Sequence, residues 1–102
     1  MKQDDHITSY EDMVDQSLPD IARSEKVVIF ASGLTDTRMI VKLLNDRGIP
    51  FRVIEMGMAS SRSRVDFRRL CEITNWHLLP QIFVDGVFVG GADELIEYLA
   101  SG

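Results

Sequence analysis

The sequence predicts an α/β domain in which helices flank a mixed four-stranded sheet, built from a βαβ unit and a following ββα unit. Its 102 residues suffice for one domain. An apolar run, a helical segment and a second strand follow one another within about 30 residues, which is the pattern of a right-handed parallel crossover. Asp85-Gly86 then separates two short apolar segments, as in a two-residue β-hairpin. One sheet therefore combines parallel and antiparallel pairs.

The N-terminal part of the chain is polar and acidic. We expect residues 1–8 to form a disordered acidic leader and residues 9–102 to form the domain. Apolar residues recur every three or four positions over about 9–23, which predicts an extra N-terminal helix. Pro19 is expected to end or kink that helix, because proline lacks the backbone N–H of a helix interior.

The predicted crossover begins with KVVIFA (Lys26–Ala31), whose continuous apolar character is typical of a strand buried on both faces. Ser32-Gly33 forms a turn, and Thr35 or Asp36 can begin the next helix. FRVIEM (Phe51–Met56) alternates enough for the second strand. The buried face of the intervening helix is expected to contain Met39, Ile40, Leu43 and Leu44.

The second half of the chain supplies one helix, the hairpin and a final helix. Ser60 or Ser61 can cap a helix that runs to about Thr74. Gln81–Val84 and Val87–Val89 flank the hairpin turn. The inward positions of the first helix are expected to be Phe67, Leu70, Cys71 and Thr74, with Ile73 beside them. Those of the final helix, over 92–100, are expected to be Leu95, Ile96 and Leu99.

Composition excludes several classes of function. Residues 1–25 account for the whole net charge of −5, and an acidic leader on a neutral domain disfavours nucleic acid as a partner. No apolar run approaches the roughly 18 residues that span a membrane, and the N-terminus lacks the apolar core of a secretion signal. The chain has one cysteine, which rules out a CxxC dithiol and an all-cysteine metal site within one chain. A reducing, cytoplasmic setting is expected.

One stretch carries a resemblance to a known family. The segment NWHLLPQIFVDGVFVGGADEL, residues 75–95, resembles the monothiol glutaredoxin pattern in its Asn-Trp, its Pro-Gln, its hairpin and its Gly-Gly. The similarity extends more loosely from about Ser24 to Gly102. It implies the thioredoxin fold in its glutaredoxin form, in which a leading helix before the first strand is also usual.

The resemblance also implies a ligand groove for glutathione. Pro80 is expected to be cis, and the main chain of Leu79 is expected to pair with the cysteinyl part of glutathione. The γ-glutamyl end is expected after Gly91, at Ala92 and Asp93, because free amides at a helix N-terminus favour a carboxylate. The loop residue His77 lies just before the proline segment and could contact a carboxylate; a histidine without a role is the competing interpretation.

The catalytic half of the family pattern is missing. The family's thiolate stands at the N-terminus of the first helix of the crossover, and thiol–disulfide exchange requires that sulfur. A basic residue that usually holds the glycyl carboxylate of glutathione is replaced by Ala31 and Ser32. Since clusters in the family use the same cysteine, no iron–sulfur cluster is expected. The degenerate active-site loop consists of Ser32, Gly33, Leu34, Thr35, Asp36 and Thr37, of which Asp36 is expected to repel an anionic tripeptide.

Two further features leave alternatives open. Cys71 is expected to be a buried, inert thiol, the alternative being a redox role from a non-standard position. A basic cluster on one helix is either a solvated face or a docking surface for an acidic partner or a carboxylate ligand. That cluster consists of Arg62, Arg64, Arg68 and Arg69.

These features predict a redox-inactive glutaredoxin-like binding or regulatory domain that mediates a protein interaction and keeps a glutathione-type groove. The alternative is a glutathione-dependent disulfide oxidoreductase that uses Cys71. A third interpretation is a structural domain that accompanies a larger protein, since glutaredoxins often continue beyond the position of Ser101-Gly102. No serine or threonine near Asp36 has a histidine partner in the predicted fold, which disfavours a hydrolytic nucleophile.

Overall fold

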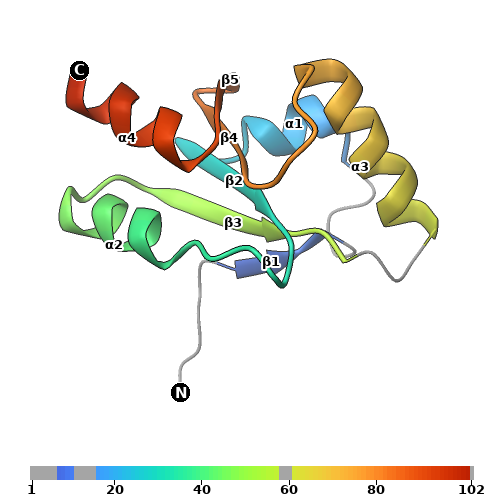
Figure 1. Cartoon of the computed structure of the whole chain (residues 1–102), viewed down its shortest axis with the longest axis horizontal. Coiled ribbons are helices and arrows are strands. Elements are labelled where there is room, and N and C mark those ends of the chain that lie inside the picture. The colour runs from blue at the N-terminus through green and yellow to red at the C-terminus, as the bar shows by residue number, and fades with distance from the viewer. Residues whose placement is uncertain (1–6, 11–15, 58–60, 102) are drawn as a thin grey trace.

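The computed structural model describes residues 7–10, 16–57 and 61–101 (Figure 1). Five strands form one sheet in the order β1-β3-β2-β4-β5, and four helices pack on it. The strands are β1 (Ile7–Ser9), β2 (Val27–Ala31), β3 (Phe51–Glu55), β4 (Gln81–Val84) and β5 (Val87–Gly90). The helices are α1 (Leu18–Ala22), α2 (Arg38–Asp46), α3 (Ser61–Thr74) and α4 (Ala92–Ser101).

The sheet is mixed, as the sequence predicts. Strand β2 lies at its centre, parallel to β3 and antiparallel to β4, with Ile29 opposite Val53 on one side and Ile82 on the other. The hairpin turn places Asp85 and Gly86 between β4 and β5, both with a positive φ. Such φ values at both central positions suit the twist of a two-residue hairpin.

The sheet has five strands where four are expected from the sequence. The additional strand β1 pairs in parallel with β3, with Ile7 opposite Val53 and Ser9 opposite Glu55. The expectation of a disordered leader over 1–8 is therefore wrong for Ile7 and Thr8, while residues 1–6 lie outside the described part. A three-residue strand is too short for an alternating pattern to reveal it, and only its partner β3 completes its hydrogen bonds.

The N-terminal helix is shorter than the predicted span of about 9–23. Ser9 belongs to β1, residues 11–15 lie outside the described part, and α1 begins at Leu18. Ser17 caps α1 by accepting a hydrogen bond from the Asp20 amide at 3.2 Å. Pro19 lies in the first turn, where a helix needs no N–H donor, so it helps to begin the helix rather than to end it.

Two apolar layers cover the two faces of the sheet. Alternate residues of β2 point to opposite faces, which explains its continuous apolar run. One layer packs α1 and α3 on the sheet and contains Ile21, Phe30, Ile54, Leu70 and Phe83 among others. The other packs α2 and α4 on the sheet and contains Ile29, Ile40, Leu44, Ile82 and Leu95 among others. In Figure 1 the α2–α4 pair and the α1–α3 pair lie toward opposite ends of the view.

Two apolar positions differ from the predicted inward faces. Met39 is 73% exposed in the first turn of α2, whereas Ile40 and Leu44 are fully buried. Ile73 is exposed on α3 beside the buried pair Leu70 and Cys71. On both helices the sheet covers a narrower stripe than the sequence pattern suggests.

No helix within residues 7–10, 16–57 and 61–101 combines the length and apolar character needed to cross a bilayer.

Candidate functional site

The loop between β2 and α2 is closed by hydroxyl hydrogen bonds. The Ser32 amide donates to Thr35 Oγ1 at 3.1 Å, and the two hydroxyl oxygens lie 2.9 Å apart. The Thr35 amide donates back to Ser32 O at 3.1 Å. Leu34 sits in this turn with 98% of its surface exposed. The loop thus forms a self-contained turn that presents an apolar side chain.

Asp36, which is expected from the sequence to repel an anionic tripeptide, is paired with Arg38. The Arg38 guanidinium donates from Nε to Asp36 Oδ1 at 3.0 Å and from Nη2 to Oδ2 at 2.9 Å. These hydrogen bonds from Arg38 lower the pKa of the Asp36 carboxyl to about 2. Both side chains are largely exposed, so the pair is screened by solvent. The loop therefore carries one charge of each sign.

Helix α2 begins later than either predicted start. Its first residue is Arg38 and its N-cap is Thr37, whose side chain makes no capping hydrogen bond. The predicted starts at Thr35 and Asp36 are wrong because the Ser32–Thr35 turn occupies that part of the chain. Leu34 consequently lies four residues before the helix, beyond the first-turn amides that would favour a thiolate.

The segment before β4 has a different construction. The Leu79–Pro80 peptide bond is cis. Leu79 packs against the core layer under α1 and α3, and Trp76 meets the Phe88 ring edge-to-face at 5.6 Å between centroids. Asn75 has a positive φ of 56°, where asparagine is tolerated better than most residues. The chain is thus anchored on both sides of the proline.

The buried side chain of Gln81 fixes this segment through hydrogen bonds. Its side chain is fully buried, and Nε2 donates to Trp76 O at 2.7 Å. Thr74 Oγ1 donates to Gln81 Oε1 at 2.8 Å, which ties the end of α3 to β4. A buried amide with its donors and acceptor satisfied fixes the surrounding chain. Sequence reasoning missed this role, although the Pro-Gln pair in the quoted pattern marked the position.

The N-terminus of α4 follows the Gly-Gly pair. The Gly91 amide donates to Glu94 Oε1 at 3.0 Å, so Glu94 caps the helix. A methyl group on Gly91 would stand 3.5 Å from Pro80 O, which shows how close the proline segment and this helix end come together. Ala92 and Asp93 form the first turn of α4. First-turn amides have no partner within their own helix and can bind a carboxylate.

Cys71 is a buried thiol on α3. It is 6% exposed, and Gln81 Nε2 lies 3.6 Å from its sulfur. Burial raises the pKa of the Cys71 thiol above its usual range. A raised pKa lowers the fraction of the nucleophilic thiolate at neutral pH.

The basic cluster on α3 does not form one face. Arg62 and Arg69 line a pocket beneath α1, whereas Arg64 and Arg68 line a separate hollow with Cys71 and His77. Spacings of seven and of four residues keep each pair together, while Arg62 and Arg64 lie about half a turn apart. His77 therefore borders the hollow beside Cys71 and is itself exposed.

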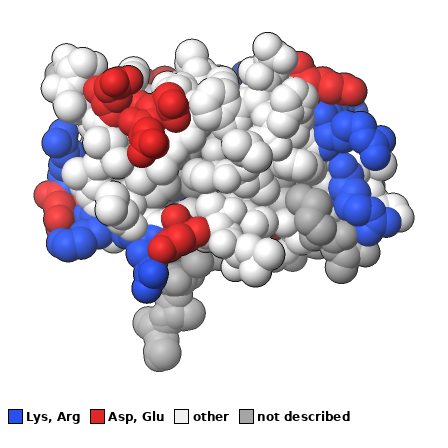
Figure 2. All heavy atoms as spheres, viewed as in Figure 1, with Lys and Arg blue, Asp and Glu red and all other residues white. Residues whose placement is uncertain are grey.

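Charged side chains do not gather into a metal site in the part of the chain that is described. No three histidine, cysteine, aspartate or glutamate side chains there could hold one ion together. On the visible face several acidic side chains lie directly beside basic ones, and one acidic group at the upper left stands apart from them (Figure 2).

Comparison with known sequences supports the resemblance. The glutaredoxin family model matches residues 27–89. An uncharacterized monothiol glutaredoxin ycf64-like protein of Synechocystis sp. is 32% identical over 88 residues, which cover 80% of this chain and 78% of that protein. The chloroplastic monothiol glutaredoxin-S7 of Oryza sativa is 29% identical over 84% of this chain but only 52% of its own length. The chain thus spans about half the length of that relative.

Solved structures confirm the predicted fold. A buckwheat glutaredoxin–glutathione complex superposes with a TM-score of 0.74 at 23% identity, covering 89% of this chain and 83% of that one. The holo form of glutaredoxin C1 from Populus tremula x tremuloides superposes with a TM-score of 0.71 at 24% identity, covering 82% and 83%. The architecture is therefore the thioredoxin fold in its glutaredoxin form.

Proposed function

We propose, since this chain belongs to the glutaredoxin family, that it is a redox-inactive member that acts by binding a partner protein and retains a groove for glutathione. The observation that carries the proposal is the β2–α2 loop. Its positions Leu34 to Thr37 contain no sulfur, and Leu34 lies outside the helix that would activate a thiol. Thiol–disulfide exchange cannot begin at this loop without a thiolate.

The remaining thiol does not replace the missing one. Cys71 is buried, and its sulfur accepts a hydrogen bond from Gln81 Nε2. Burial raises the pKa of its thiol. A reactive cysteine requires access and a lowered pKa, and Cys71 has neither. Its burial also leaves the chain without the donor set that an iron–sulfur cluster requires, because such clusters bind through accessible thiolates.

The groove is supported by groups that belong to the backbone. The segment around Leu79 is fixed by Gln81, and the first turn of α4 offers the amides of Ala92 and Asp93. A helix N-terminus favours a carboxylate such as that of a γ-glutamyl group. The buckwheat relative was solved as a complex with glutathione, which makes this tripeptide the natural first ligand to test.

The loop itself favours contact with a protein. Leu34, Met39 and Leu78 are among the most exposed large apolar side chains that the structure describes. In the sequence, Leu34 and Met39 flank the Asp36–Arg38 pair, and Leu78 immediately precedes the Leu79–Pro80 segment. Exposed apolar side chains rimmed by charge are typical of a recognition surface.

The test is a titration of the isotopically labelled chain with reduced glutathione, followed by NMR at physiological ionic strength. We expect amide shifts clustered at Leu79, Ala92 and Asp93, with a dissociation constant in the millimolar range. Ala92→Pro, which removes one of these amides at the first helical position, where proline is tolerated, should weaken binding, and Glu97→Ala, on the same helix but beyond its first turn, is the control. No shift at these amides up to tens of millimolar would refute the groove.

A second candidate is a glutathione-dependent oxidoreductase that uses Cys71. The observation in its favour is the hollow beside Cys71, which Arg64, Arg68 and His77 also line. Positive groups near a sulfur favour its thiolate. Modification of native Cys71 by a thiol reagent, compared with the same reaction in denaturant, separates the two candidates. Equal rates in the two states would favour the enzyme.

A further inference from the structure

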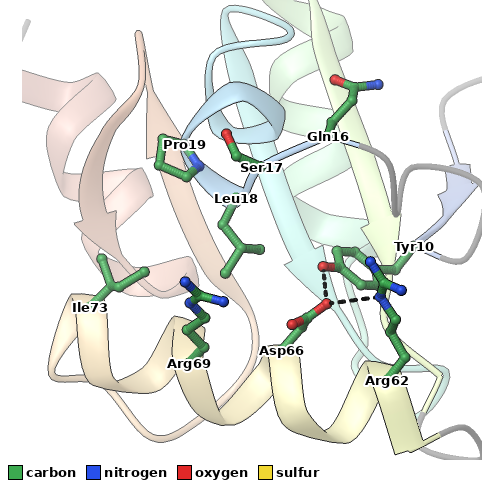
Figure 3. Close-up of a pocket in the computed structure, with 9 residues that line it drawn as sticks. All are labelled: Tyr10, Gln16, Ser17, Leu18, Pro19, Arg62, Asp66, Arg69 and Ile73. Atoms are coloured by element: carbon green, nitrogen blue, oxygen red, sulfur yellow. Dashed lines mark hydrogen bonds and ion pairs between the residues drawn. The ribbon is translucent and has the colours of Figure 1, made fainter.

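A pocket of about 270 Å³ lies between α1 and α3 (Figure 3). None of its lining residues belongs to the Ser32–Thr37 loop, to the Leu79–Pro80 segment or to α4. It is therefore independent of the proposed glutathione groove. Figure 3 shows α3 forming its lower wall and the start of α1 its upper wall, with side chains from both pointing into the space between them.

The charged groups of the pocket come from one side of α3. Arg62, Asp66 and Arg69 line it, so among the described residues two guanidinium groups stand with one carboxylate. Asp66 is already engaged: Tyr10 Oη donates to its Oδ2 at 2.6 Å, and Arg62 Nε lies 3.8 Å from the same oxygen. Among the described residues, Arg69 forms no salt bridge.

The Tyr10–Asp66 hydrogen bond gives the pocket a fixed floor. Tyr10, the residue that follows β1, is 2% exposed. Its hydrogen bond to Asp66 ties this part of the chain to the middle of α3. The Asp66 side chain is only 17% exposed, whereas that of Arg62 is 60% exposed. The carboxylate is thus held below the guanidinium groups, and a ligand entering from solvent meets positive charge first.

The opposite wall is apolar with a polar edge. Leu18 and Pro19 of α1 face Ile73 of α3 across the pocket, and Ile73 is left exposed there. Ser17 and Gln16 add a hydroxyl and an amide at the rim. An apolar wall beside a few placed polar groups is typical of a small-molecule site.

We propose that this pocket binds a small monocarboxylate that carries an apolar group, with the carboxylate at Arg69 and the apolar part against Leu18, Pro19 and Ile73. A guanidinium group matches the planar carboxylate with two parallel hydrogen bonds. The Asp66 carboxylate disfavours a dianion such as phosphate, because it repels the second negative charge. The volume suits a ligand of about ten non-hydrogen atoms.

Phenylacetate is the probe, titrated into the labelled full chain and followed by NMR of the backbone amides and the arginine Nε–Hε groups. We expect shifts at Arg69, Arg62 and Ser17 and a dissociation constant in the millimolar range, as for a ligand of this size. Phenylacetamide, its neutral counterpart, should bind about fivefold more weakly or not at all, and inorganic phosphate should also bind more weakly than phenylacetate.

Two substitutions should move the affinity in opposite directions. Arg69→Gln should weaken phenylacetate binding by about three- to fivefold, and Arg68→Gln, the neighbouring arginine outside the pocket, should change it by less than about twofold. Asp66→Asn should tighten binding by about three- to fivefold, because it removes a negative charge and keeps an acceptor for Tyr10. Damage to the fold cannot produce that gain.

Several results would overturn the proposal. Equal binding of phenylacetamide would show that the carboxylate is not recognised, and tighter binding of phosphate would show an anion site of another kind. Shifts confined to Leu79, Ala92 and Asp93 would place phenylacetate in the other groove. Failure of Asp66→Asn to tighten binding would remove the electrostatic basis of the site.

Discussion

The β2–α2 loop and the segment that enters β4 are held by different kinds of interaction. The loop is closed by hydroxyl hydrogen bonds between Ser32 and Thr35 and by the exposed Asp36–Arg38 pair. The segment before β4 is tied into the interior by the buried side chain of Gln81. Exposed ion pairs add little to stability, whereas a buried polar group must keep its partners. The difference predicts that the β2–α2 loop tolerates substitution more readily than the segment before β4.

The largest expected effect concerns Gln81. Gln81→Leu keeps the volume but leaves Trp76 O without its donor, so we expect a loss of about 3 kcal/mol in the free energy of unfolding. Urea denaturation of the wild-type and variant chains measures this loss. Gln16→Ala, an exposed glutamine, is the control and should change stability by less than about 0.5 kcal/mol. If the two substitutions lowered the free energy of unfolding equally, the buried hydrogen bonds of Gln81 would not stabilise the chain more than an exposed side chain does.

Gly90 gives the next largest effect. Its φ is 126°, and a methyl group there would stand 2.7 Å from Glu94 Cβ. Gly90→Ala should therefore cost about 2 kcal/mol and disturb the start of α4. Gly57→Ala, where a methyl group meets no atom within 4 Å, is the matched control and should be close to neutral in thermal unfolding. If Gly90→Ala left the stability unchanged in thermal unfolding, the backbone at Gly90 would not be constrained by its positive φ or by Glu94.

Cys71→Ala should cost about 1 kcal/mol, as the loss of a small buried side chain. The effect should also depend on pH. Burial raises the pKa of the folded-state thiol, so the unfolded chain loses its proton first. The difference in the free energy of unfolding between the wild-type chain and Cys71→Ala is therefore complete below the ordinary thiol pKa of about 8.5. It declines as the pH rises through the folded-state pKa of Cys71.

Unfolding of both chains between pH 7 and 10 checks this dependence, and the difference between them cancels the other titrating groups. A difference that grows with pH would mean that the folded chain stabilises the Cys71 thiolate. That result would favour the oxidoreductase alternative.

The smallest expected effect compares two engineered thiols in the loop. Thr37→Cys places sulfur at the N-cap of α2, whereas Leu34→Cys places it in the exposed turn. The thiol of the Thr37→Cys variant should have the lower pKa, by about half a unit, because only it reaches the first-turn amides. Both should be made in a Cys71→Ala background and titrated by thiolate absorbance. A lower pKa for the Leu34→Cys thiol would show that α2 extends toward Leu34.

Much of the fold follows from sequence patterns that are local. The apolar run of β2 and the Asp85-Gly86 turn predict the crossover and the hairpin because each depends on neighbouring residues. Strand β1 escapes detection because three residues carry no period and depend on β3. The sequence predicts too early a start for α1, because Pro19 suits a first turn as well as it opposes a helix interior.

Less of the candidate site than of the fold can be predicted from the sequence. The missing cysteine at Leu34 to Thr37 is visible directly, but the Arg38 hydrogen bonds to Asp36 depend on side-chain geometry. The Tyr10–Asp66 hydrogen bond joins residues 56 positions apart, which no local pattern reports. The division of the arginine cluster could have been derived from helical spacing alone, because Arg62 and Arg64 lie about half a turn apart.

The proposed absence of redox activity in this glutaredoxin family member is tested most directly by reduction of a mixed disulfide between glutathione and a small thiol. We expect no rate above the uncatalysed reaction for the wild-type chain and no change on Cys71→Ala. A wild-type rate above background that Cys71→Ala abolishes, with the fold intact by NMR, would contradict this proposal and assign the activity to Cys71.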